Sequence, residues 1–255
     1  MNIHADRNSW ESHWDNTGKT GFMAKFTEWM RFNMLANSVR DSLDKYCKID
    51  GVYIEAGCGT SQTSDKINKK GKFIIALDFA KNTLYNAMKV KKNDAFINAD
   101  IMKMPFKDNS IAGIWNLGVV EHFPHNEAVE FMKEFKRILK PEGTLLLFWP
   151  PKISVDTIIL RPIEFIISLY KGRKYTVFPA EPYRATKSRV LNVAKDAGFR
   201  LIGVEFPAST GFTHWVVALR PELSGSINAD NRKLRVQANR TNQKRQPVNK
   251  MDGSR

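Results

Sequence analysis

VYIEAGCGTSQTS, residues 52–64, passes from a β-rich apolar run into a turn with two glycines and then into small hydroxyl residues. Glycine is favoured where the backbone takes a positive φ or where another group approaches the main chain closely. A strand ending in Glu55, with Gly57-Cys58-Gly59 before the start of a helix, is typical of nucleotide-binding folds. The turn by itself is a weak signal, so the pattern around it has to agree.

The chain after residue 50 alternates between short apolar runs and helical patterns. A helical pattern over residues 126–140 places its apolar side chains on one face and ends at Lys140-Pro141-Glu142-Gly143. Nearly continuous apolar strands joined by helices favour a parallel sheet that is covered on both faces. The expected strands are residues 52–56, 73–77, 95–99, 111–117 and 144–149.

Two further β-rich runs, residues 199–206 and 213–220, are separated only by PASTGF. This connection is too short for a parallel crossover, so we expect an antiparallel pair. The sequence therefore predicts an α/β fold, a Rossmann-like seven-stranded sheet that is mostly parallel with an antiparallel last strand. Ligands of such a sheet bind at the carboxyl ends of its strands.

Length and composition favour one α/β domain with appendages. Residues 1–50 are expected to form a helical cap, and residues 51–220 the main domain with a lid insertion at about 151–186. Residues 221–255 carry eight Lys/Arg against three Asp/Glu and few large apolar side chains, which predicts a disordered basic tail. The polar N-terminus and only two cysteines predict a cytoplasmic protein with no disulfide framework.

An acidic residue at the end of the second expected strand supports the nucleotide-binding interpretation. Asp78 follows Gly57 by 21 positions, near the ~20 expected of a carboxylate that binds a ribose. A helix-capping role for Asp78 is compatible with this one. Thr60-Ser61-Gln62 follows the turn without the third glycine of a dinucleotide fingerprint, which favours a ligand without phosphates.

With these motifs in place, the chain resembles the class I S-adenosylmethionine (SAM)-dependent methyltransferases, in particular the small-molecule group that includes the ubiquinone/menaquinone-type enzymes. The resemblance covers roughly residues 51–150 and the terminal strand pair at 199–220. It rests on IEAGCGTS (54–61), ALDFA (76–80), NADIMKMPFKDNSIAGIWNLGVVEHF (98–123) and LKPEGTLLLFWP (139–150). The series is specific for the family, whereas its single elements are not.

The resemblance implies SAM as the cofactor and assigns roles to the matching positions. The glycine turn would receive the amino-acid end of SAM, Asp78 the ribose, Asp100 and Ile101 the adenine, and Asn116 the methionyl end. Alternative interpretations are a loop or cap role for Asp100 and an ordinary turn for the glycines. The full set of expected cofactor-binding residues is Glu55, Gly57, Cys58, Gly59, Asp78, Phe79, Asp100, Ile101 and Asn116.

Catalytic residues are harder to assign from this pattern. His122, in EHFPHNE, is a candidate general base, although lining the pocket or capping the following helix are alternative roles. His122 and His125 lack a third ligand at a suitable spacing, so no metal site is predicted. Trp10 and Trp14 are candidates for contacting the positively charged sulfonium.

The predicted function is transfer of a methyl group from SAM to a small, lipophilic acceptor by in-line displacement. The alternative is an RNA or protein methyltransferase that uses the basic surface and tail, although no Asn/Asp-Pro-Pro-aromatic signature follows the fourth strand. A NAD-dependent oxidoreductase and a SAM-binding module without turnover are further alternatives. The pattern does not define the oligomeric state.

The insertion at residues 153–170 suggests a peripheral membrane contact. Its apolar residues are followed by Lys171, Arg173 and Lys174, and it is too short and too charged to span a bilayer. A lid helix packed on the core is the alternative. The apolar residues are Ile158, Ile159, Ile163, Phe165, Ile166, Ile167 and Leu169.

Overall fold

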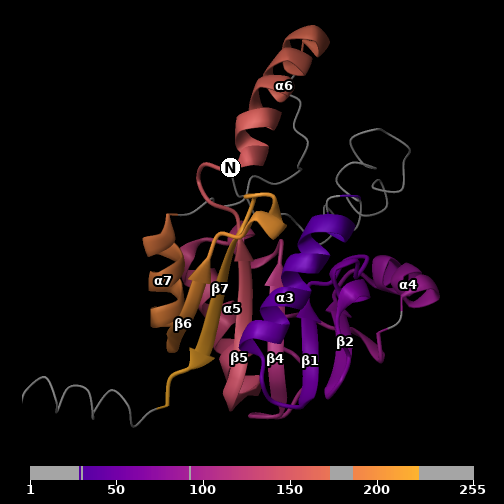
Figure 1. Cartoon of the computed structure of the whole chain (residues 1–255), viewed down its shortest axis with the longest axis vertical. Helices are drawn as coiled ribbons and strands as arrows, with labels where there is room; N and C mark the ends of the chain where they lie inside the picture. The colour runs from indigo at the N-terminus through magenta and orange to yellow at the C-terminus, as the bar shows by residue number, and fades with distance from the viewer. Residues whose placement is uncertain (1–28, 30, 92, 173–185, 224–255) are drawn as a thin grey trace, which may run out of the picture. The chain divides into compact units, whose positions relative to one another are not determined.

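The computed structural model describes residue 29 and residues 31–91, 93–172 and 186–223, and its central feature is one seven-stranded sheet (Figure 1). The strand order is β3-β2-β1-β4-β5-β7-β6. The strands are β1 (Gly51–Ala56), β2 (Lys72–Asp78), β3 (Ala95–Asn98), β4 (Ile111–Leu117), β5 (Leu139–Trp149), β6 (Phe199–Glu205) and β7 (Trp215–Pro221).

Only β7 runs against its neighbours. β1 to β5 pair in parallel, and β7 pairs antiparallel with both β5 and β6. The predicted fold class and the predicted antiparallel pair are therefore confirmed. The strand order reverses between β1 and β4, which is the point where ligands bind in open α/β sheets.

The helices connect these strands and cover the sheet. The longer helices are α3 (Ala36–Tyr46), α4 (Lys81–Val90), α5 (His125–Ile138), α6 (Val155–Lys171) and α7 (Lys187–Asp196). The short ones are a π-helix η1 (Arg31–Leu35) and the 3-10 helices η2 (Thr63–Lys66), η3 (Val120–His122) and η4 (Ala208–Thr210).

One face of the sheet is covered by α5 and α7. Phe131, Met132 and Phe135 of α5 are buried against strand side chains such as Ile54 and Leu147. These α5 positions follow the helical spacing that the sequence predicted. The larger of the buried clusters therefore lies between this face and its two helices.

The opposite face is covered by α3. Val39 and Leu43 pack against Tyr53 and Trp115, both fully buried. A Cβ at Gly113 would lie 2.4 Å from the Tyr53 ring, so β4 has no side chain where that ring crosses it. Helices thus cover both faces, as predicted.

Two local expectations were wrong. The helix expected after Gly59 is only the 3-10 turn η2, because Ser61 has a positive φ of 51° and the next hydroxyls bond to Glu55. The helix expected to extend to Lys140 ends at Ile138, because Leu139 already pairs with Ile111 in the sheet.

Several predictions concern segments outside the described residues. Trp10, Trp14 and most of the predicted N-terminal cap precede residue 29, and nearly all of the basic tail follows residue 223. The predicted domain boundaries remain a prediction. Within the described part of the chain, no helix has the length and apolar character needed to cross a bilayer.

The packing of α5 predicts a large cost for truncating its central side chain. Phe135 is fully buried, so Phe135→Ala should lower the free energy of unfolding by about 3–5 kcal/mol through lost burial and the cavity that remains. Urea denaturation measures this. Phe73→Ala is the control, because Phe73 is 48% exposed and should cost about 1 kcal/mol or less. Similar losses in both variants would contradict the assignment of the core.

Candidate functional site

The predicted site residues follow the carboxyl ends of four adjacent strands. Glu55 and the glycine turn end β1, Asp78 ends β2, Asp100 follows β3, and Asn116 lies at the end of β4. The strand register places Ala56 opposite Leu77 on one side and opposite Asn116 on the other. The parallel order therefore brings residues that are far apart in sequence to one edge.

The conformation and the neighbours of the glycine turn explain why side chains are excluded there. Gly57 and Gly59 have φ values of 73° and 50°, in the left-handed region that favours glycine. A Cβ at Gly57 would lie 2.3 Å from Cγ2 of Val119, in the turn after β4. Val119 thus packs directly on the backbone of Gly57.

Asp78 joins the end of β2 to this turn. Its Oδ2 accepts a hydrogen bond from the Gly59 amide at 2.7 Å, and its Oδ1 accepts one from the Ala80 amide at 2.8 Å, at the entrance to α4. Burial raises the pKa of the carboxyl, while the backbone N–H groups of Ala80, Gly59 and Phe79 lower it. An ionised carboxylate has about four lone-pair sites, so these two bonds leave capacity for further donors.

Glu55 organises the loop that follows the turn. Its buried carboxyl accepts hydrogen bonds from the hydroxyls of Ser61 at 2.6 Å, Ser64 at 2.5 Å and Thr63. The Trp115 indole N–H donates to Thr63 Oγ1 at 3.2 Å. Burial raises the pKa of Glu55, and the hydrogen bonds from these groups oppose that rise. The side chain therefore fixes the loop from within.

Asn116 holds the turns after β1 and β4 together. Its side-chain amide donates to the Ala56 carbonyl at 2.7 Å, and its Oδ1 accepts from the Val120 amide at 3.2 Å. The side chain is buried. In this structure Asn116 thus fixes the position of Val119 next to Gly57.

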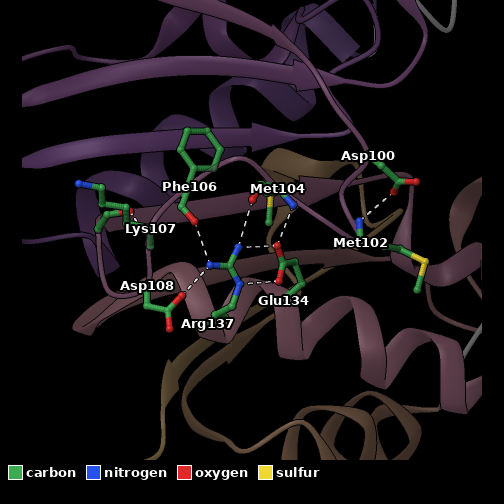
Figure 2. Close-up of polar contacts among 9 residues, drawn as sticks. Asp100, Met102, Met104, Phe106, Lys107, Asp108, Glu134 and Arg137 are labelled. Carbon is green, nitrogen blue, oxygen red and sulfur yellow. Dashed lines mark hydrogen bonds and ion pairs between the residues drawn. The ribbon is translucent and has the colours of Figure 1, made fainter.

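The residues expected near the adenine lie in the loop between β3 and β4. Asp100 is exposed, and its Oδ1 accepts a hydrogen bond from the Met102 amide at 2.9 Å (Figure 2). Ile101 is buried in the larger core cluster, so its side chain anchors this loop. Phe79 follows Asp78 directly and is half-buried.

A network that the sequence analysis missed fastens the same loop to α5. Arg137 makes paired hydrogen bonds to Glu134 and donates to Asp108 and to the carbonyls of Met104 and Phe106 (Figure 2). Glu134 also accepts a bond from the Met104 amide at 2.7 Å. These carboxylates raise the pKa of Arg137. The i, i+3 spacing of Glu134 and Arg137 in the sequence was the available signal.

The candidate base lies at the same edge. His122 is half-buried at the end of η3, and its backbone amide bonds to the Val119 carbonyl at 2.9 Å. Its neighbour Glu121 is buried. Because Val119 also contacts Gly57, this bond places the backbone of His122 close to the glycine turn.

The surroundings of Cys58 do not favour thiol chemistry. Cys58 is buried beside two carboxyls, and burial raises its pKa well above the ordinary value, so the thiol stays protonated. Among the described residues, no group of His, Cys, Asp and Glu is arranged to hold a metal ion. The edge instead offers hydrogen-bond acceptors and bare backbone, which suit a ligand with hydroxyl and amine groups.

Part of the chain is similar to known methyltransferases. Residues 54–147 match the family model described as a methyltransferase domain. A malonyl-[acyl-carrier protein] O-methyltransferase from Buchnera aphidicola is 34% identical over 94 residues, 36% of this chain and 37% of that protein. Cycloartenol-C-24-methyltransferase 1 from Oryza sativa is 29% identical over 129 residues, 49% of this chain and 35% of that protein.

A solved structure matches more of the chain. Magnesium protoporphyrin IX methyltransferase from Synechocystis, with bound SAH (S-adenosylhomocysteine), covers 86% of this chain and 97% of its own, with 16% identity and a TM-score of 0.60. At this identity the match shows a shared fold. The family match at residues 54–147 covers less than half of the chain. The matches span only about a third of the length of these two curated relatives.

The contact between Val119 and Gly57 predicts a difference between two glycine positions. Gly57→Ala should lower the free energy of unfolding by about 1–3 kcal/mol more than Gly118→Ala, because it adds a steric clash to the cost of a positive φ. Gly118 has a φ of 85° with no atom within 4 Å of an added Cβ, so Gly118→Ala measures the cost of the positive φ alone. Equal losses in chemical denaturation would contradict the close approach.

The buried carboxyl of Glu55 predicts a pH-dependent stability. A raised folded-state pKa gives stability that is fully present below the unfolded pKa of about 4.3 and is lost as the pH rises through the folded pKa. Wild type should therefore become less stable relative to Glu55→Gln between pH 4.5 and 8. Urea midpoints of both proteins across this range measure the difference. A difference that stays constant, or that favours wild type at high pH, would contradict the prediction.

Proposed function

We propose that this protein is a SAM-dependent methyltransferase that transfers the methyl group of SAM to a small-molecule acceptor. The observation that carries the proposal is the hydrogen bond between the Gly59 amide and the Asp78 carboxylate, which joins the turn after β1 to the end of β2 next to the β1–β4 reversal of strand order. This bond places the glycine turn, which has no side chains at Gly57 and Gly59, beside the buried carboxylate of Asp78, a hydrogen-bond acceptor. The match of residues 54–147 to a methyltransferase domain supports it.

The proposed cofactor contacts follow from the strand ends. The turn at Gly57, Cys58 and Gly59 receives the amino-acid end of SAM, and Asp78 accepts hydrogen bonds from the ribose. Such charge-assisted bonds contribute about 1.5–3 kcal/mol each. Two buried carboxyls, Glu55 and Asp78, have raised pKa values at this edge, and a nearby positive charge stabilises their ionised forms.

Other residues of the proposed site act in different ways. Asp100 and Phe79 contact the adenosine from the β3 and β2 ends, respectively. Glu55, Ile101 and Asn116 position the backbone, since their side chains bond or pack within the protein. The Glu134–Arg137 pair supports the Asp100 loop from α5. In this proposal, buried side chains behind the ligand hold the binding residues in position.

The proposed reaction needs little chemistry from the protein. SAM supplies an activated methyl group on a sulfonium, and the acceptor displaces it in line. The residues of this edge orient the two reactants, and positioning of this kind lowers barriers by several kcal/mol. We assign His122 as the general base for acceptors that lose a proton, because it lies next to Val119 at the same edge.

The proposed acceptor is a small lipophilic molecule. α6 follows β5 at the carboxyl edge and exposes several large apolar side chains, including Phe165 and Leu169. The names of the relatives include acyl-carrier-protein, cycloartenol and magnesium protoporphyrin substrates, which differ too much to specify one acceptor.

Substitution of the ribose carboxylate tests the proposal. Asp78→Asn should weaken SAM binding about tenfold to hundredfold, because an amide cannot replace a charged double acceptor. Calorimetric titration measures the affinity. Asp41→Asn, an exposed carboxylate paired with Arg40, is the control and should bind as wild type does.

Turnover is measured with methyl-labelled SAM and fractionated cell extract. The label should appear in a lipid or metabolite fraction. Label in RNA or protein would overturn the small-molecule acceptor but not the methyl transfer. A folded wild-type protein that does not bind SAM would overturn the proposal as a whole.

A further inference from the structure

Helix α6 exposes the side that a globular protein would normally bury. Ile158, Phe165, Ile166 and Leu169 are spaced i, i+7, i+8 and i+11, so they lie on one face of the helix. Their exposed fractions are 64%, 64%, 64% and 67%. Figure 1 shows that α6 continues from the end of β5 at which the chain leaves the sheet. An apolar face of this size in contact with water marks an interaction surface.

Two polar residues of the same helix are less exposed than its apolar face. Glu164 and Ser168 are half-buried, and Ser168 donates a hydrogen bond to the Glu164 carbonyl at 2.7 Å. Tyr170, at the end of the helix, is 92% exposed. Glu164 and Ser168 thus lie on the more protected side of the helix. This arrangement argues against a lid whose apolar face packs on the core of the described residues.

The charges around the apolar face indicate what covers it. Residues 152–174 contain five basic and two acidic side chains. Lys152 precedes the helix, Arg161 lies within it and Lys171 ends it, and all three are exposed. Arg173 and Lys174 follow in the sequence. Apolar residues combined with basic ones are the composition of a helix that lies on an anionic membrane surface.

We propose that α6 is an interfacial helix that docks this protein onto anionic lipid. Ile158, Phe165, Ile166 and Leu169 enter the boundary between headgroups and acyl chains, and the exposed Lys152, Arg161 and Lys171 lie near the phosphates. The docking itself does not depend on the chemistry at the sheet edge. The role that we assign to this docking is the uptake of a lipophilic acceptor at the edge where β5 and β1 end. This role rests on the proposed function.

Vesicle flotation of the full chain tests the docking. Vesicles of phosphatidylcholine with phosphatidylglycerol should bind wild type at low salt, and binding should fall as salt screens the charges. Phe165→Gln combined with Leu169→Gln should lower the partition coefficient about tenfold or more through lost apolar burial, with no change in net charge. Phe73→Gln combined with Tyr85→Gln removes two exposed aromatic side chains elsewhere and should bind as wild type does.

Other occupants of the face give different outcomes. Equal vesicle binding by wild type and the α6 variant, or none by wild type, would overturn the proposal. A wild-type dimer that the α6 variant abolishes, found by light scattering without vesicles, would assign the face to a second copy and would also overturn it. Thermal unfolding confirms that both variants fold. SAM titration without vesicles reports on the proposed function separately, so either proposal can fail alone.

Discussion

The hydrogen bond from the Gly59 amide to the Asp78 carboxylate is the interaction on which the site depends. It fixes the turn after β1 against the end of β2, while Asn116 and Val119 fix the same turn against the end of β4. Three strand ends are thereby held as one unit. This edge therefore presents turn backbone next to a buried carboxylate.

The sheet could be predicted because its strands carry strong local signals. Residues 111–117 are a nearly continuous apolar run and form β4 with these bounds, and the short PASTGF connection required the antiparallel pair. The helix after Gly59 could not be excluded from the sequence. Its absence depends on the backbone of Ser61 and on hydroxyl bonds to Glu55, which form only when the strand end and the loop meet.

Site residues were predicted where their chemistry is local, as for the acid that ends β2. Supporting residues were missed because their partners lie far away in the sequence. Arg137 binds carbonyls about thirty positions earlier, and the Trp115 indole donates to Thr63, 52 positions earlier. The amphipathic pattern of α6 could likewise be predicted from the sequence, but the face of the helix that contacts water could not. That face depends on how the helix leaves β5.

The most direct test of this account is a chemical-shift titration of the ¹⁵N-labelled protein with S-adenosylhomocysteine. The account predicts saturable shifts that centre on the amides of Gly57, Gly59 and Ala80, with smaller ones in the loop from Asp100 to Met102. No saturable shift, or shifts confined to other parts of the sheet, would contradict the claim that this edge binds an adenosyl ligand.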